Sequence, residues 1–265
     1  MNKKDNVSKI MGALFLLGLL AASIAVSIHN FQMQTAFAVS ATDNAATNDG
    51  NNITNTTQPT STHLMNSGTV PTDAETKLVL ALRDLWVDHT DWTRMYIVSF
   101  LADLPDTDVV AQRLLKNQED IGNAIKPFYG EDAGNKLTDL LNGHILVAVD
   151  LLKAAKAGDS SAATVSEEEW YQNADEIASF LSGANPNWSK DDLRNMLNEH
   201  LVLTKAEAVA RLTGNYTGDI ATFDQIHKHA NGMSDAIVAG IVKQFPERFS
   251  TTVSTPSATT VPKTS

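Results

Sequence analysis

Three histidines recur at nearly equal intervals within apolar stretches of the chain. His89, His144 and His200 are separated by 55 and 56 residues, and each follows a leucine or a methionine by four residues. Neutral imidazole is a common ligand of zinc, copper, iron and nickel. Three equivalent histidines could therefore meet around one divalent transition-metal ion. The alternative is that each is an ordinary core residue whose ring nitrogens are satisfied by hydrogen bonds within the protein.

Two carboxylates and a fourth histidine could complete such a site. Glu207 lies two helical turns beyond His200 on the same side, as a ligand or as the hydrogen-bond partner of one. His227 continues an apolar stripe through Phe223, and Asp224 precedes it by three residues, a spacing that places both on one helix face. His227 and the nearby His229 could equally be surface residues. The predicted metal ligands are thus His89, His144, His200, Glu207, Asp224 and His227.

Familiar catalytic motifs are missing from the sequence, so we predict no catalytic residues and favour a protein that is not an enzyme. The chain has no cysteine, which excludes disulfides, thiolate zinc sites and cysteine nucleophiles. It has no His-Glu-x-x-His motif, no EF-hand loop, no Gly-x-Ser-x-Gly and no phosphate-binding glycine loop. The ferritin-like di-iron pattern requires two Glu-x-x-His motifs, whereas this chain offers a single Asp-x-x-His. A divalent metal ion is the only cofactor that the residues indicate.

The segment that must position these residues is predicted to be entirely helical. Apolar residues recur every three or four positions from 73 to 249, and alternating β-branched runs are missing. The predicted helices cover about 73–103, 106–126, 131–157, 160–181, 190–213 and 218–245, with Asp106 and Ser189 as N-terminal caps. Helices of this length joined by short links pack as an antiparallel bundle. The predicted fold class is all-α, an antiparallel bundle of about six helices.

An internal repeat relates the helices that carry the histidines. A shift of 56 residues brings Leu141-Asn142-x-His144 onto Leu197-Asn198-x-His200, and Gly158 onto Gly214. A shift of 55 residues brings His89 onto His144. The pattern predicts a repeated helical hairpin in which each histidine lies near the middle of a helix. If these helices are neighbours at matching heights, the imidazoles converge.

The N-terminus has the features of an export signal. Lys3, Lys4 and Lys9 precede an uncharged apolar run over 10–28, and the small residues of Ala36-Phe37-Ala38 follow. Residues 1–38 are therefore a cleaved signal peptide or a retained membrane anchor, and the rest of the chain is extracytoplasmic. Residues 39–72 form a Ser/Thr/Asn-rich disordered linker and 250–265 a similar tail. Glycosylation sequons begin at Asn52, Asn55, Asn187 and Asn215.

Composition limits the kinds of partner. Lysine and arginine number 20 against 31 aspartates and glutamates, which gives a net charge of −11. Nucleic-acid binders carry basic patches, so we predict no nucleic-acid partner. Contact with a membrane is expected only through an uncleaved N-terminal segment. Two functions fit this composition: a bundle that holds a metal ion or small ligand, or a structural module that contacts another protein of the cell envelope.

Seven segments of the folded stretch carry a family resemblance. They read LWVDHTDWTR, LADLPDTDVVAQRLLKN, IKPFYG, LLKAAKAGD, WYQNADEIA, EHLVLTKAEAVARLTGNY and IVKQFPERF. These segments resemble an uncharacterised family of small helical prokaryotic proteins, and the likeness covers nearly all of the folded stretch. Members are sometimes labelled acetylglutamate kinase or glycosyltransferase, activities that need a nucleotide-binding α/β fold with strands and a glycine-rich loop. The resemblance implies the all-α domain and its boundaries, and no site residue.

Overall fold

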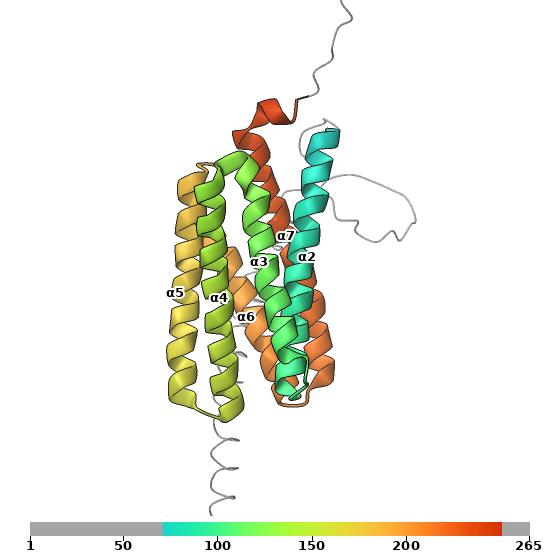
Figure 1. Ribbon diagram of the computed structural model, residues 1–265, viewed down its shortest axis with the longest axis vertical. Helices are drawn as coiled ribbons and strands as arrows, with labels where there is room; N and C mark the ends of the chain where they lie inside the picture. The colour runs from blue at the N-terminus through green and yellow to red at the C-terminus, as the bar shows by residue number, and fades with distance from the viewer. Residues whose placement is uncertain (1–70, 251–265) are drawn as a thin grey trace, which may run out of the picture.

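The computed structural model describes residues 71–250, and in that range the chain forms six long helices and no strand (Figure 1). The predicted signal or anchor and nearly all of the predicted linker and tail lie outside these residues. Among the described helices, none is both long and apolar enough to cross a membrane. The helices are α2 (Asp73–Leu101), α3 (Thr107–Tyr129), α4 (Glu131–Ala157), α5 (Ser160–Ala184), α6 (Lys190–Leu212) and α7 (Tyr216–Gln244), followed by the short 3-10 helix η2 (Pro246–Arg248).

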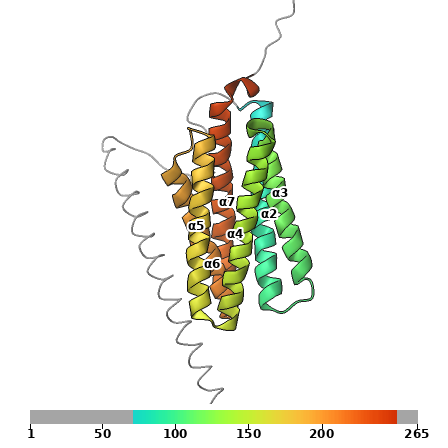
Figure 2. The same cartoon turned by 60° about the vertical axis from the view of Figure 1, so that its left-hand side comes forward.

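Consecutive helices run up and down beside one another and close into a ring. Each helix packs against the next along the chain, α7 packs against α2, and α6 also touches α2. Helices α2, α4 and α6 consequently run in the same direction, with α3, α5 and α7 antiparallel to them (Figures 1 and 2). The prediction of an all-α antiparallel bundle is confirmed.

Most helix ends follow from local hydrogen bonding. The side chains of Thr72, Asp159, Ser189 and Asn215 each accept a hydrogen bond from a backbone N–H in the first turn of α2, α5, α6 and α7, as expected for N-terminal caps. Asp106 is at the predicted N-cap position of α3, but its side chain makes no such bond. The second helix was predicted to end at about residue 126, whereas α3 includes Pro127, continues to Tyr129 and ends at Gly130, whose φ of 85° reverses the chain.

The bundle consists of three helical hairpins, α2–α3, α4–α5 and α6–α7. The link inside each hairpin contains one residue with left-handed backbone conformation: Asp103 (φ 54°), Gly158 (φ 71°) and Gly214 (φ 75°). Each lies 14 residues after the histidine of its own hairpin. The predicted hairpin repeat is therefore present, and it occurs three times.

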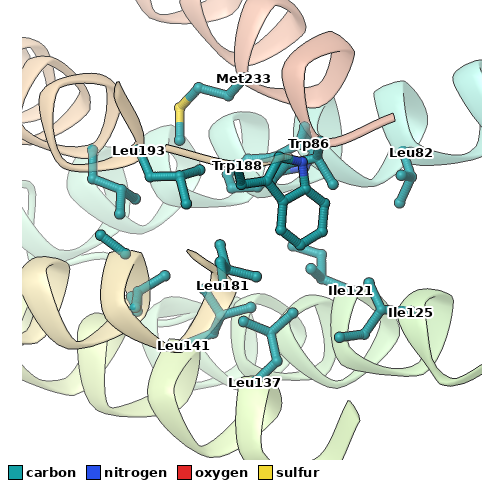
Figure 3. Close-up of a cluster of buried hydrophobic side chains, with 14 of the residues drawn as sticks. Leu82, Trp86, Ile121, Ile125, Leu137, Leu141, Leu181, Trp188, Leu193 and Met233 are labelled. Carbon is teal, nitrogen blue, oxygen red and sulfur yellow. The ribbon is translucent and has the colours of Figure 1, made fainter. Parts of the chain in front are cut away.

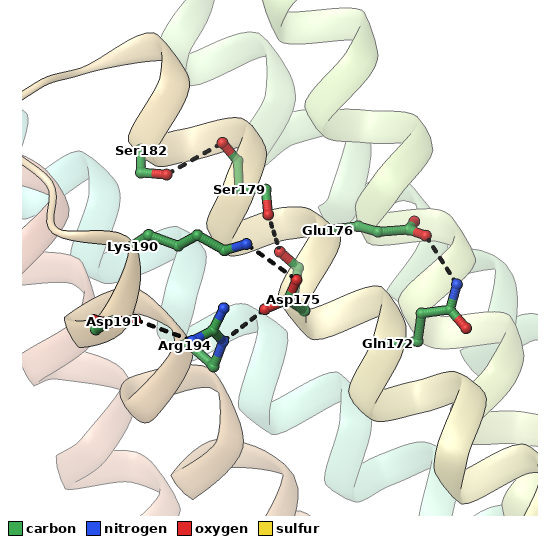
Figure 4. Close-up of polar contacts among 8 residues, drawn as sticks. All are labelled: Gln172, Asp175, Glu176, Ser179, Ser182, Lys190, Asp191 and Arg194. Atoms are coloured by element: carbon green, nitrogen blue, oxygen red, sulfur yellow. Dashed lines mark hydrogen bonds and ion pairs between the residues drawn. The ribbon is translucent and has the colours of Figure 1, made fainter.

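Two apolar clusters fill the bundle. The larger contains Trp86, Trp170 and Trp188 together with many leucines and isoleucines from all six helices. Figure 3 shows part of this cluster around Trp86 and Trp188. The smaller contains Tyr96, Ile97, Val110, Leu114, Ile145 and Leu152. On the surface between α5 and α6, Asp175 accepts hydrogen bonds from Lys190 at 3.2 Å and from Arg194 at 2.6 Å (Figure 4).

Candidate metal centre

His89, His144 and His200 meet inside the bundle, where the two apolar clusters adjoin. We call these three residues the histidine layer. They come from the parallel helices α2, α4 and α6, and each is only 3–4% exposed. The ring centroids of His89 and His200 are 5.5 Å apart, and those of His144 and His200 are 6.3 Å apart. The three histidines lie at the same level along the bundle axis because they occupy equivalent positions in the hairpin repeat.

Each histidine of the layer is in contact with the residue that follows it by 29 positions, on the second helix of its hairpin. His89 Nδ1 lies 3.2 Å from Gln118 Nε2, and His144 Nδ1 lies 2.8 Å from Asn173 Oδ1. In the third hairpin the matching residue is His229, whose ring stacks beside that of His200 with centroids 6.5 Å apart. In the first two hairpins the repeat therefore includes an amide group that can orient the imidazole as well as the imidazole itself.

The same partner helices hold the backbone just before each histidine. Asn173 Nδ2 donates to Leu140 O at 3.1 Å, and His229 Nε2 donates to Met196 O at 2.9 Å. In the first hairpin Asn117, which neighbours Gln118, donates to Leu85 O at 2.9 Å. Each accepting carbonyl belongs to the residue four positions before the histidine. These bonds fix how the two helices of a hairpin are aligned along the bundle axis. They therefore also fix the position of the imidazole along that axis.

The hydrogen bonds also determine which nitrogens remain available. Asn173 donates to Leu140 through Nδ2, so its Oδ1 accepts from His144 Nδ1–H and leaves the lone pair of His144 on Nε2. His144 Nε2 and His200 Nδ1 are buried without a hydrogen-bond partner. A buried polar atom left in this way costs about 1–3 kcal/mol. Gln118 Oε1, beside His89, is likewise unpartnered.

Burial keeps the histidine layer uncharged at neutral pH. Desolvation lowers the pKa of His144 to about 4, and desolvation together with the neighbouring imidazole of His144 lowers the pKa of His89 to about 4. Desolvation together with His89, His144 and His229 holds the pKa of His200 well below its ordinary value. Neutral imidazole is the form that binds metals.

Glu207 does not join the histidine layer. It is 2% exposed and its Oε1 lies 2.5 Å from Arg94 Nη1, which also binds Asp219 at 2.6 Å. Arg211 reaches the other oxygen of Asp219 at 3.3 Å. Desolvation raises the pKa of Glu207 to about 7, an effect that Arg94 opposes. The four residues form a buried network of two cations and two carboxylates that connects α2, α6 and α7.

Asp224 and His227 lie on the outer face of α7, apart from the histidine layer. Asp224 is exposed, and His227 is half-buried with Nε2 3.6 Å from Asp91 Oδ1. The predicted stripe through Phe223 and His227 had the wrong phase, because α7 instead buries Asp219 and Ile226. His229 takes the place expected of His227. The signal that could have identified His229 is its spacing of 29 from His200, which repeats the spacing of Asn173 from His144.

As the side chains stand, no three histidine, aspartate or glutamate residues within 71–250 are arranged closely enough to hold a metal ion. Comparisons with protein-family models, curated proteins and solved structures give no match to this chain. The family resemblance of its sequence segments therefore stays a prediction.

Proposed function

We propose that this protein is an extracytoplasmic helical bundle that binds one transition-metal ion at the histidine layer. The observation that carries the proposal is the convergence of three neutral, buried imidazoles, two of which have a nitrogen without a hydrogen-bond partner. A metal ion would use those lone pairs, and the amide partners on α3 and α5 would orient the rings, as residues behind a metal ligand commonly do.

The ring spacing is close to that of a metal site. Two imidazoles bound to one zinc ion at tetrahedral angles, with the nitrogens about 2.1 Å from the metal, have ring centroids roughly 5 Å apart. The pair His89–His200, at 5.5 Å, nearly matches this separation, and the pair His144–His200, at 6.3 Å, must close by roughly 1 Å. Such a shift needs a small movement of α4 relative to α6.

His89 needs a change of hydrogen bonding to act as a ligand through Nε2. Its Nδ1 must then carry the proton and donate it to Gln118 Oε1, which requires the Gln118 amide group to turn over and to give up the bonds that its Nε2 donates to Leu114 O at 2.9 Å and to Asn117 Oδ1 at 3.1 Å. An all-imidazole set suits zinc or copper better than magnesium or calcium, which prefer oxygen ligands. The nearby carboxylate Glu207 is already paired with Arg94, so it does not compete for the metal in this arrangement.

Titration of the metal-free full chain with Zn²⁺, without an affinity tag, tests the proposal. We expect one ion per chain, and free zinc at 100 times the dissociation constant should stabilise the fold by about 2.7 kcal/mol. His89→Gln, His144→Gln and His200→Gln should each lower the affinity at least tenfold, because each removes one of only three ligands. His227→Gln is the matched control, since His227 lies on the outer face of α7 and should bind zinc as the parent does.

Two results would contradict metal binding at the layer. One is a chain that takes up neither zinc nor copper and melts at the same temperature with metal or chelator. The other is uptake that is lost in His227→Gln but kept in the three layer variants. Either result would favour the alternative function, a structural module of the cell envelope in which the layer only forms hydrogen bonds within the core.

A further inference from the structure

A cavity of about 690 Å³ lies one helical turn beyond the histidine layer. Thr93, Ala148 and Thr204, each four residues after a histidine of the layer, line it together with Trp170. It extends toward the link between α4 and α5, where Gly158 also contributes to its wall. Pockets of roughly 300–1,000 Å³ are typical of sites that enclose a small molecule.

Small side chains leave this space open. The wall contains several alanines, among them Ala148, Ala155, Ala163 and Ala208. The repeat shows what stands at one of these positions elsewhere: Ala208 follows His200 by eight residues, and the residues at the same distance from His89 and His144 are Ile97 and Leu152. Both are large and buried. The third hairpin thus departs from the repeat at a position where a larger side chain would occupy part of the cavity.

The charges around the cavity are already balanced. Lys205 Nζ donates to Glu167 Oε1 at 2.5 Å, and Lys156 Nζ donates to Asp103 Oδ1 at 2.5 Å. Asp159 accepts a hydrogen bond from Ala162 N at the start of α5. The rest of the wall is mostly apolar, so a charged ligand would lose its hydration without gaining a free counter-charge.

We infer that this cavity binds one neutral, mainly apolar small molecule. Aliphatic and alanine side chains and the Trp170 ring would contact its carbon skeleton. A hydroxyl or carbonyl group on the ligand would find hydrogen-bonding partners in the Lys205–Glu167 pair. None of the three histidines of the layer lines the cavity. The inference therefore does not depend on whether the layer binds a metal ion.

Fluorescence titration of the full chain with N-phenylnaphthylamine, a neutral dye that brightens in apolar surroundings, tests the inference. We expect saturable binding of one dye per chain. Ala208→Leu should weaken binding at least tenfold because its side chain occupies part of the space that the dye needs, and Ala155→Leu is a second cavity variant in case the first does not fold. Ala221→Leu, the same change at an exposed position of α7 outside the cavity wall, should bind the dye as the parent does.

A charged probe checks the ligand class. Anilinonaphthalene sulfonate, an anion with a similar ring system, should bind at least about tenfold more weakly than the neutral dye. Equal or tighter binding of the anion would overturn the assignment to neutral ligands. Non-saturable dye binding, or an unchanged affinity in every cavity variant that folds, would overturn the site. Dye titrations in the presence of zinc and of a chelator should agree, so failure of metal binding would leave this result intact.

Discussion

The buried imidazoles of His89, His144 and His200 make the stability of the metal-free protein depend on pH. In the unfolded chain a histidine takes up a proton near pH 6.5, whereas His89 and His144 in the folded protein stay neutral down to about pH 4. The unfolded state therefore binds more protons between these values, and the free energy of unfolding falls as the pH is lowered. Above pH 6.5 the histidines leave stability unchanged.

Glu207 acts in the opposite direction over part of the same range. Its pKa is raised to about 7, so the folded state takes up a proton that the unfolded state takes up only near pH 4.5. Near pH 5.5 the unfolded chain binds about three more protons than the folded protein at the histidines and about one fewer at Glu207. Unfolding therefore takes up about two protons, and the free energy of unfolding changes by ~2.7 kcal/mol per pH unit. Urea unfolding at several pH values in the presence of a chelator would measure this slope.

A single variant tests where that slope comes from. His144→Gln removes one buried imidazole, so the slope should decrease by about one proton, or ~1.4 kcal/mol per pH unit. A slope that is unchanged in His144→Gln would show that the acid sensitivity of the protein has another origin.

At the scale of the helices, Arg94 holds α2 against α6 and α7 through two buried carboxylates. Arg94→Met would leave Glu207 and Asp219, both about 2% exposed, with less positive charge beside them. Removing one partner of a buried ion pair costs about 3–5 kcal/mol, and we expect a loss of that size in urea unfolding at a pH well above the pKa of about 7 of Glu207, where both carboxylates are ionised. Adding Glu207→Gln to Arg94→Met should recover part of the loss, because it removes one of the unpaired charges.

Arg194→Met serves as the control for Arg94→Met. Arg194 also pairs with a carboxylate, that of Asp175, but both side chains are about 40% exposed on the surface between α5 and α6 (Figure 4). Exposed ion pairs contribute little to stability, so the urea midpoint should hardly change. Equal losses in the two variants would mean that burial of the Arg94 network has no special energetic role.

The helix ends give a prediction in which the same substitution has opposite effects. Gly214 has a φ of 75°, and Gly214→Ala should lower the free energy of unfolding by about 1 kcal/mol because alanine is strained there. Gly183 lies inside α5, and an added Cβ would meet no atom within 4 Å. Gly183→Ala should raise the free energy of unfolding by up to about 1 kcal/mol, since alanine favours a helix. Thermal unfolding of both variants would show whether the signs differ.

The sequence was sufficient to predict the helices and the convergence of the three histidines, because both follow from local patterns of residues. Apolar spacing determines helical segments, and the repeated Leu/Met-x-x-x-His marks equivalent positions in α2, α4 and α6. The partners of the histidines depend on how two helices are aligned, which the pattern of one helix does not contain. The buried face of the first half of α7 was mispredicted for a related reason: Asp219 is buried by its bonds to Arg94, and hydropathy alone places an aspartate outside.

In the whole molecule, the ends of the described chain and the cavity lie at opposite ends of the bundle. α2 begins and α7 ends on one side (Figure 1), where Arg248 also binds the carbonyl of Pro127 at 2.8 Å. The cavity reaches the link between α4 and α5 on the other side. If residues 1–38 are retained as a membrane anchor, which is one of the two alternatives that the sequence leaves open, the cavity lies at the end of the bundle opposite to the beginning of α2.

The closed ring of three hairpins has one more consequence, which concerns the order of the chain. Because α7 packs against α2 much as α3 packs against α4, no hairpin occupies a special first or last place in the ring. The beginning of α2 and the end of α7 are also on the same side of the bundle. The fold is therefore suited to circular permutation: a peptide bridge from η2 to α2, with new ends in the α5–α6 link, would keep every helix contact while the polypeptide starts at a different hairpin.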